Sequence, residues 1–189
     1  MKVFVVTEGQ TDAQFFGLLL SRRAGTGFTV VPAGGKSATI SLAQSLLVSR
    51  HQPVALIIDA DSVFAEGVRE QMSIYDDMLR SRSMQTPFLL LVAVPEMESL
   101  FFESKEVLSA VGMIPSDRQA VDAKYQPKRV LDQLLRKKDW TRAEFFNRLP
   151  VTAIDELAKL PLLSRLIDFV KQPRGSETWS NAQYQALSD

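Results

Sequence analysis

The chain has 189 residues, of which 46% are apolar, so it has the length of one domain and enough apolar material for a large core. Its 22 basic and 22 acidic side chains balance, and composition therefore gives no general case for an electrostatic nucleic-acid binder. Cysteine is absent and His51 is the only histidine, which excludes disulfides, thiol catalysis and thiolate or histidine-cluster metal sites, so any metal must be bound by oxygen.

Strands and helices alternate along the first 98 residues. Apolar runs predict strands at 2–7, 28–31, 54–58 and 88–94, and apolar side chains at helical spacing predict helices at 11–24, 37–50 and 66–82. Strands that are apolar throughout are typical of a parallel sheet covered on both faces. We therefore predict an α/β core at residues 1–98, in which helices flank a mostly parallel four-stranded sheet.

Only helices are predicted after residue 98. They lie at 104–111, 127–138 and 141–148, with two shorter pieces between 152 and 171, and Gly112 and several prolines separate them. We expect residues 99–171 to be an all-helical C-terminal addition packed on the core. Residues 172–189 are polar and predict a loosely held tail, in which Trp179 is the residue able to dock.

Acidic side chains follow three of the four predicted strands. Ligands of open parallel sheets bind outside the carboxyl ends of the strands. Asp59 and Asp61 form a D-x-D motif directly after the third strand. Alternate residues of an extended segment point the same way, so the two carboxylates lie close together and repel unless a cation or a proton lies between them. Oxygen ligands suit magnesium, manganese or calcium, although one D-x-D motif after a strand is also compatible with a structural role. The candidate metal ligands are Glu8, Asp12, Asp59, Asp61, Glu96 and Glu98.

Glycines mark two of these strand ends. Gly9 follows the first strand, and Gly34 and Gly35 follow the second, directly before Lys36. Glycine is used where the backbone takes a positive φ or where a ligand comes close, so these residues indicate either tight turns or a phosphate-binding approach that includes Lys36. The run GGKSAT is not a P-loop, because that motif requires glycine at the position of Val30.

A basic segment lies in the predicted helical part. Seven basic side chains stand against two acidic ones between residues 124 and 142. Such a run forms either a solvated helix face or a nucleic-acid surface, for which Arg129, Lys137 and Lys138 are the candidate contacts. Tyr125 and Trp140 are interleaved with them and either stack on bases or pack in the core.

The ordered motifs resemble a known superfamily. A strand ending in Glu8-Gly9, a second strand ending in Gly34-Gly35, and the run ALIIDADS with Asp59 and Asp61 together resemble the Toprim domain of topoisomerases, primases, small nucleases and recombination proteins. The resemblance covers about residues 1 to 100. Within that superfamily, EGQTD at 8–12 and VPEMESLFF at 94–102 are most similar to OLD-type nucleases and their small stand-alone relatives.

This resemblance implies a magnesium- or manganese-dependent nuclease of phage defence or DNA repair. Glu8 would be a metal ligand or the general acid/base, and Asp59 and Asp61 would hold magnesium. Asp12, Glu96 and Glu98 would complete a second metal position, and Lys124 or Lys128 would be the catalytic lysine. The partners implied are nucleic acid and a separate ATPase or defence-system protein.

Other functions remain open from the sequence. A Toprim-like domain can serve as a non-catalytic module that binds nucleic acid or protein within a larger complex. A D-x-D phosphatase would use Asp59 as nucleophile and Asp61 as acid/base, but it normally carries the motif on its first strand. No apolar run approaches the roughly 20 residues of a membrane span, and the N-terminus lacks the features of a secretory signal, so we expect a cytoplasmic protein without membrane contact.

Overall fold

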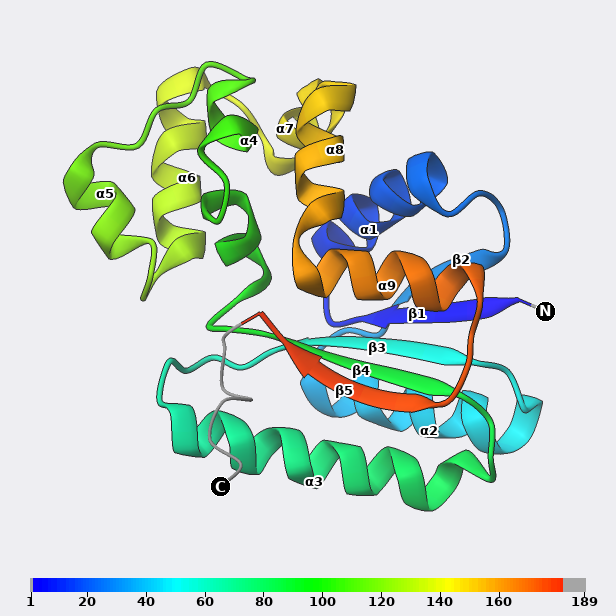
Figure 1. Cartoon of the computed structure of the whole chain (residues 1–189). Helices are drawn as coiled ribbons and strands as arrows, with labels where there is room; N and C mark the ends of the chain where they lie inside the picture. Colours follow the sequence, from blue (N-terminus) through cyan, green and yellow to red (C-terminus); the bar gives the residue numbers. More distant parts are fainter. Residues whose placement is uncertain (1, 182–189) are drawn as a thin grey trace.

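A five-stranded parallel sheet forms the centre of the molecule (Figure 1). The structure is a computed structural model and describes residues 2–181. The strand order is β2-β1-β3-β4-β5, and every neighbouring pair is parallel. This confirms the predicted α/β class with a parallel sheet flanked by helices. The strands are β1 (Val3–Thr7), β2 (Phe28–Pro32), β3 (Val54–Asp59), β4 (Phe88–Ala93) and β5 (Ser176–Ser180).

The fifth strand corrects two expectations, because four strands and a loosely held tail were predicted. Ser176–Ser180 instead pairs with β4, with Thr178 opposite Leu90. Trp179 packs against the core, and the Arg165 guanidinium lies 4.0 Å from its ring centroid. The segment SETWS is mostly polar because it pairs on one side only, so it lacks the apolar run expected of a central strand. The rest of the predicted tail, 182–189, lies outside the described residues.

The helices follow the predicted alternation and then form a long insertion. Because β5 returns to the sheet, the helical segment lies between β4 and β5 and is not a C-terminal addition. Two of its pieces, η1 and α5, were not predicted, because each is short and α5 buries none of its side chains. The helices are α1 (Gln10–Arg23), α2 (Lys36–Arg50), α3 (Ala65–Ser83), η1 (Met97–Phe102), α4 (Lys105–Ser109), α5 (Asp117–Asp122), α6 (Pro127–Lys138), α7 (Arg142–Arg148), α8 (Val151–Lys159) and α9 (Pro161–Lys171).

Both faces of the sheet are buried, which explains the uninterrupted apolar strands. Successive side chains of β4 alternate between two cores: Leu89 and Leu91 join one cluster, and Leu90 and Val92 join the other. Helices α2 and α3 cover one face, and α1, α8 and α9 cover the other (Figure 1). Within the described residues, no helix combines the length and apolar character needed to cross a bilayer.

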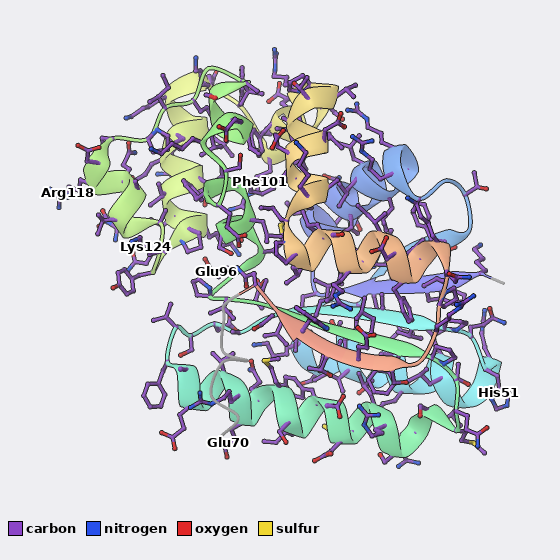
Figure 2. All side chains as sticks on the ribbon, viewed as in Figure 1. His51, Glu70, Glu96, Phe101, Arg118 and Lys124 are labelled. Carbon is purple, nitrogen blue, oxygen red and sulfur yellow. The ribbon has the colours of Figure 1, made fainter. Side chains whose placement is uncertain are left out.

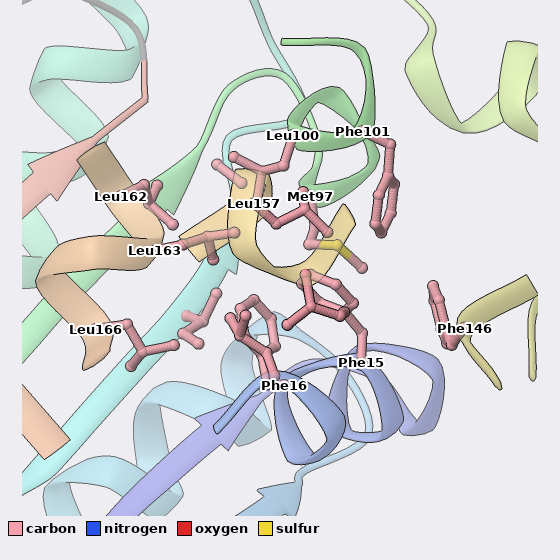
Figure 3. Packing of buried hydrophobic residues seen from close by; sticks show 14 of the residues in the cluster. Phe15, Phe16, Met97, Leu100, Phe101, Phe146, Leu157, Leu162, Leu163 and Leu166 are labelled. Atoms are coloured by element: carbon pink, nitrogen blue, oxygen red, sulfur yellow. The ribbon is translucent and has the colours of Figure 1, made fainter. Parts of the chain in front are cut away.

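An aromatic cluster attaches the helical insertion to the sheet. The Phe101 ring of η1 lies 5.0 Å from that of Phe15 on α1 and 5.2 Å from that of Phe145 on α7, measured between ring centroids. Phe146 packs against Phe15 and Phe101 as well (Figure 3). Edge-to-face pairs of this kind add to the stabilisation gained from burial. The cluster therefore packs η1 and α7 against α1.

The strand order places a ligand crevice between β1 and β3. Strand β1 pairs with β2 on one side and with β3 on the other, so the chain reverses its direction of progress across the sheet at β1. At such a reversal the two connecting helices lie on opposite faces and leave a crevice outside the carboxyl ends of the strands. Glu8 and Asp59 stand at this point.

Candidate active site at the carboxyl ends of the strands

One cavity of about 420 Å³ lies outside the carboxyl ends of β1, β3 and β4. We call it the acid cavity. Its lining includes side chains that are far apart in the sequence, because the parallel strands bring their ends to the same edge of the sheet. Three residues of the helical insertion, Lys128, Asp132 and Arg142, complete it. All six predicted ligands line this cavity: Glu8, Asp12, Asp59, Asp61, Glu96 and Glu98.

Carboxylates link the three strand ends. Glu8 Oε1 accepts a hydrogen bond of 3.0 Å from the Asp59 backbone N–H, and Asp59 Oδ1 accepts one of 2.8 Å from the Met97 N–H. Each acid thus binds the backbone at or just beyond the end of the neighbouring strand in the sheet. Hydrogen bonds from an N–H to a carboxylate are stronger than neutral ones. The pair therefore defines how the ends of β1, β3 and β4 sit relative to one another.

Gly9 allows Asp12 to approach the chain closely. The Gly9 N–H donates a hydrogen bond of 3.1 Å to Asp12 Oδ2 across the first turn of α1, and a Cβ at Gly9 would lie 3.3 Å from the same oxygen. That distance is tighter than most Cβ contacts, so a side chain here would push the carboxylate away. The position of Asp12 in the first helical turn also suits a negative charge.

Gly34 and Gly35 fix the peptide that carries Glu8. Their φ angles are +88° and +124°, values that side chains disfavour, and their N–H groups donate to the Glu8 carbonyl oxygen at 2.9 and 3.1 Å. Lys36 follows them, and its Nζ lies 2.6 Å from Asp61 Oδ2. The glycines thus act in a turn, which is one of the two interpretations open from the sequence, and Lys36 pairs with a predicted metal ligand.

The D-x-D motif departs from its expected geometry. Strand β3 ends at Asp59, and Asp61 takes a left-handed backbone with φ of 57°. The argument from alternation along an extended segment therefore does not apply to Asp61. Its side chain is 65% exposed, whereas Asp59 is largely buried. Both acids still line the acid cavity, but Asp59 lies inside it and Asp61 at its rim.

Crowding perturbs the acids of the cavity. Burial, followed by the charges of Glu98, Asp12 and Glu8, raises the pKa of Asp59 to about 8. Burial and the neighbouring Glu98 raise the pKa of Asp12 to about 6. Burial is also the main cause that raises the pKa of Glu96. The cavity therefore holds more negative charge than it can stabilise by itself, and it favours binding of a proton or a cation.

Arg142 is the functional candidate that the sequence did not reveal. Its guanidinium hydrogen-bonds Glu98 and also donates to Asp132 Oδ1, at 2.8 Å from Nη2. Glu98 is 3% exposed, so this pair lies inside the protein. Thr141 begins α7 with a capping box and thereby places Arg142 at the first helical position. That local signal is visible in the sequence, but nothing in it connects Arg142 with an acid on η1.

The predicted basic residues separate into different locations. Lys128 lines the acid cavity, and its backbone N–H donates to Glu96 Oε2 at 3.2 Å. Glu96 lies where the chain leaves β4 for the helices (Figure 2). Lys124 lines another cavity, beside Pro95 and Glu103. Arg129 lines a cavity that adjoins the first. Lys137 and Lys138 line neither of the two, in the described part of the chain.

Trp140 takes the structural role of the two considered. It is partly buried against the main core, and the Arg148 and Lys138 cations lie 4.5 and 5.9 Å from its ring centroid. Such cation–π contacts occupy the ring and leave little of it for a base. Tyr125 differs, because 63% of it is exposed. Of the two aromatic residues in the basic segment, Tyr125 is therefore the one available to a ligand.

The acids suit a metal ion by chemistry but are not arranged around one. Among residues 2–181, no three Asp, Glu or His side chains are grouped closely enough to hold a metal ion as they stand. Their oxygens bind backbone N–H groups, Lys36 or Arg142 instead. A set of buried carboxylates with raised pKa values nevertheless fits a divalent cation that prefers oxygen, because the ion would relieve their repulsion.

Comparisons of the chain with protein-family models, with curated proteins and with solved structures find no match. Residue chemistry and geometry at the acid cavity therefore carry the functional argument.

Proposed function

We propose that this protein is a Toprim-type nuclease that uses Mg²⁺ or Mn²⁺ to cleave phosphodiester bonds of DNA or RNA. One observation carries the proposal. The acids at the ends of β1, β3 and β4 line a single cavity, and two cations from the helical insertion, Lys128 and Arg142, line the same cavity. Buried acids destabilise a fold unless they are compensated, so their gathering at the ligand-binding edge favours a functional role.

Glu8 and Asp59 would hold the metal, with Asp12 and Glu98 beside them. When bound, a divalent ion supplies an activated water and neutralises charge on the leaving oxygen. Glu8 Oε1 is used by the Asp59 N–H, whereas Glu8 Oε2 has no hydrogen-bond partner among the described residues. This second oxygen is suited to accept a proton from the attacking water, because general bases require an unoccupied acceptor within reach.

Lys128 and Arg142 would interact with the substrate phosphate. Cations placed in advance next to a phosphoryl group stabilise the charge that grows on its oxygens. Lys128 has no ion-pair partner among the described residues, so its charge is available. Arg142 is shared with Glu98 and Asp132, and its contribution would follow from a change of partner. We assign the catalytic lysine to Lys128 in preference to Lys124, which lines another cavity.

A phage-defence or repair setting, with a separate ATPase as partner, rests on the resemblance of EGQTD and VPEMESLFF to OLD-type nucleases. Nucleic acid is the proposed substrate and partner. The cytoplasm is the proposed compartment.

A non-catalytic binding module is the second candidate. The observation in its favour is that the described acids bind backbone N–H groups and basic side chains and form no ready metal group. A D-x-D phosphatase has less support. Its nucleophile would be Asp59, whose raised pKa of about 8 keeps most of it protonated and therefore weakly nucleophilic at neutral pH. Its acid/base would be Asp61, which pairs with Lys36.

Cleavage assays test the proposal directly. The purified protein is incubated with supercoiled DNA, single strands and RNA, with Mg²⁺, with Mn²⁺ or with a chelator. We expect metal-dependent cleavage, and we expect Glu8→Gln and Asp59→Asn to lower the rate by about 100-fold or more, as loss of a general base or metal ligand does. Glu70→Gln is the matched control, because Glu70 is exposed on α3, far from the acid cavity (Figure 2).

Two results would count against the nuclease. If Glu8→Gln and Asp59→Asn cleaved at the wild-type rate, the acid cavity would not be the active site. If no substrate were cleaved but nucleic acid were bound, the second candidate would replace the first. Hydrolysis of a small aryl phosphate, with a phosphoryl group trapped on Asp59, would instead support the phosphatase.

A further inference from the structure

A second cavity, of about 450 Å³, adjoins the acid cavity. We call it the Tyr125 groove. It shares Glu96, Lys128 and Asp132 with the acid cavity, so the two are neighbouring parts of one depression. Beyond these shared residues, Tyr125, Arg129 and Arg136 line the groove. Nothing in the proposed cleavage chemistry requires them, so the groove calls for an explanation of its own.

Tyr125 offers a flat aromatic surface to a ligand. It lies between α5 and α6, where 63% of it is exposed, although large aromatic side chains usually bury most of their surface. An exposed ring that lines a cavity is suited to stacking. Nucleic-acid bases stack on tyrosine whatever their sequence, because every base has a π face.

The groove also carries unpaired positive charge. Lys128, Arg129 and Arg136 form no ion pair with any other described residue. Arg129 donates a hydrogen bond of 2.8 Å to Gln126 Oε1, which is a neutral acceptor and leaves the charge uncompensated. From Lys128 to Arg136 the helix rises by about 12 Å, so one phosphate cannot contact both ends. A ligand with several phosphates in a row is required.

The acids of the groove lie only at the boundary with the acid cavity. Asp132 already pairs with Arg142, and Glu96 accepts a hydrogen bond from the Lys128 backbone N–H. Away from that boundary, the charged groove residues are Arg129 and Arg136, both basic. Positive charge therefore increases from the acid cavity along the groove, which suits a polyanion that enters by the groove and ends at the acids.

We propose that the Tyr125 groove binds a single-stranded segment of nucleic acid, with a base stacked on Tyr125 and the backbone phosphates along Arg129 and Arg136. The strand would run from the groove into the acid cavity, where the proposed nuclease acts, so this inference rests on the proposed function. A single strand is favoured over a duplex, because only an unpaired base can present its face to the tyrosine ring.

Fluorescence anisotropy measures how tightly the protein binds labelled oligothymidine and oligouridine. A chelator is present to prevent cleavage, so the assay tests binding in the groove alone. We expect single strands to bind more tightly than a blunt duplex of the same length. Tyr125→Ala is expected to weaken binding by about tenfold, within the range of one base–aromatic stack, whereas Tyr125→Phe keeps the ring and should bind as the wild type does. Tyr125 is exposed, so neither variant should disturb folding.

The salt dependence tests the arginines. Loss of one phosphate contact lowers the slope of log K against log salt by about 0.7 for a single strand. We expect this change for Arg136→Ala. Lys137→Ala is the matched control, because Lys137 is the next residue on α6 with the same charge and does not line the groove. Equal slopes for the two variants would contradict the assigned strand path.

The outcomes separate this inference from the proposed function. If Tyr125→Ala bound single strands as tightly as the wild type, or if a duplex bound better, or if no nucleic acid bound, the groove assignment would be wrong. If Glu8→Gln lost cleavage and the wild type preferred a duplex, the nuclease would be kept and the groove assignment rejected. Single-strand binding that depends on Tyr125, without cleavage under any condition, would keep the groove and reject the nuclease.

Discussion

Replacement of Arg142 by methionine should destabilise the protein measurably. Methionine keeps the length of the side chain but removes the guanidinium, and Glu98 is then left unpaired with its side chain only 4% exposed. Removing one partner of a buried ion pair costs about 3–5 kcal/mol, because an uncompensated charge stays buried. Asp132 is 40% exposed and Arg142 itself 19%, so water screens part of the loss. We therefore expect the lower end, about 3 kcal/mol.

Urea denaturation followed by circular dichroism measures this loss, and thermal unfolding should show a fall in Tm of about 6–12 °C for a chain of this size. Adding Glu98→Gln to Arg142→Met removes the buried charge and should restore most of the stability. Arg118→Met is the control, because Arg118 is 93% exposed and stands 4.0 Å from Asp122, and no measurable change is expected. The reasoning is refuted if Arg142→Met is as stable as the wild type, or if Glu98→Gln gives no recovery.

Three further predictions concern the site and the core. In a chelator, the wild type should lose more stability than Asp59→Asn as the pH rises from about 4 to about 8. The pKa of Asp59 in the folded state, about 8, lies above its ordinary value of 3.8, so in this range the folded wild type holds a proton that the unfolded chain has released, and a rise in pH favours unfolding. Urea titrations across that range measure the difference, and parallel pH profiles would contradict it. Phe101→Ala should cost about 3–5 kcal/mol of unfolding free energy, because Phe101 is fully buried in the aromatic cluster, whereas Phe64→Ala, at a side chain that is 64% exposed, should change little. Gly35→Ala should cost about 1–3 kcal/mol of unfolding free energy, because φ of 124° with ψ of 164° is essentially restricted to glycine. Gly17→Ala is the control: a Cβ in the middle of α1 meets no neighbouring atom there, so this variant should be neutral or stabilising. Equal stability of the two glycine variants would refute the backbone strain at Gly35.

The parallel core was predictable because its signal is local. Residues on both faces of a central strand must be apolar, so β3 and β4 appear as uninterrupted apolar runs, and the helices between them show helical spacing. The fifth strand could not be found in this way. Residues of β5 lie at the edge of the sheet and need only one partner, so their polar sequence resembles that of a loop.

The candidate site was partly predictable for a similar reason. Carboxylates placed directly after apolar strands indicate which edge of a parallel sheet they will share, and six such acids do line one cavity. Their hydrogen-bond partners were not predictable. The Gly34-Gly35 pair, for instance, suggested a ligand or a turn, and only the bonds from both amides to the Glu8 carbonyl oxygen assign it to a turn.

The sequence by itself determined the four strands β1 to β4 and the edge of the sheet at which the acids gather, because each follows from which neighbouring residues are apolar and which are charged. Tertiary structure alone decided that Arg142 meets Glu98, that Lys128 rather than Lys124 reaches the acid cavity, and that Tyr125 rather than Trp140 stays exposed. These choices depend on how the helical insertion packs on α1 through its aromatic cluster. Packing of that kind joins residues distant in the chain, and no local pattern records it.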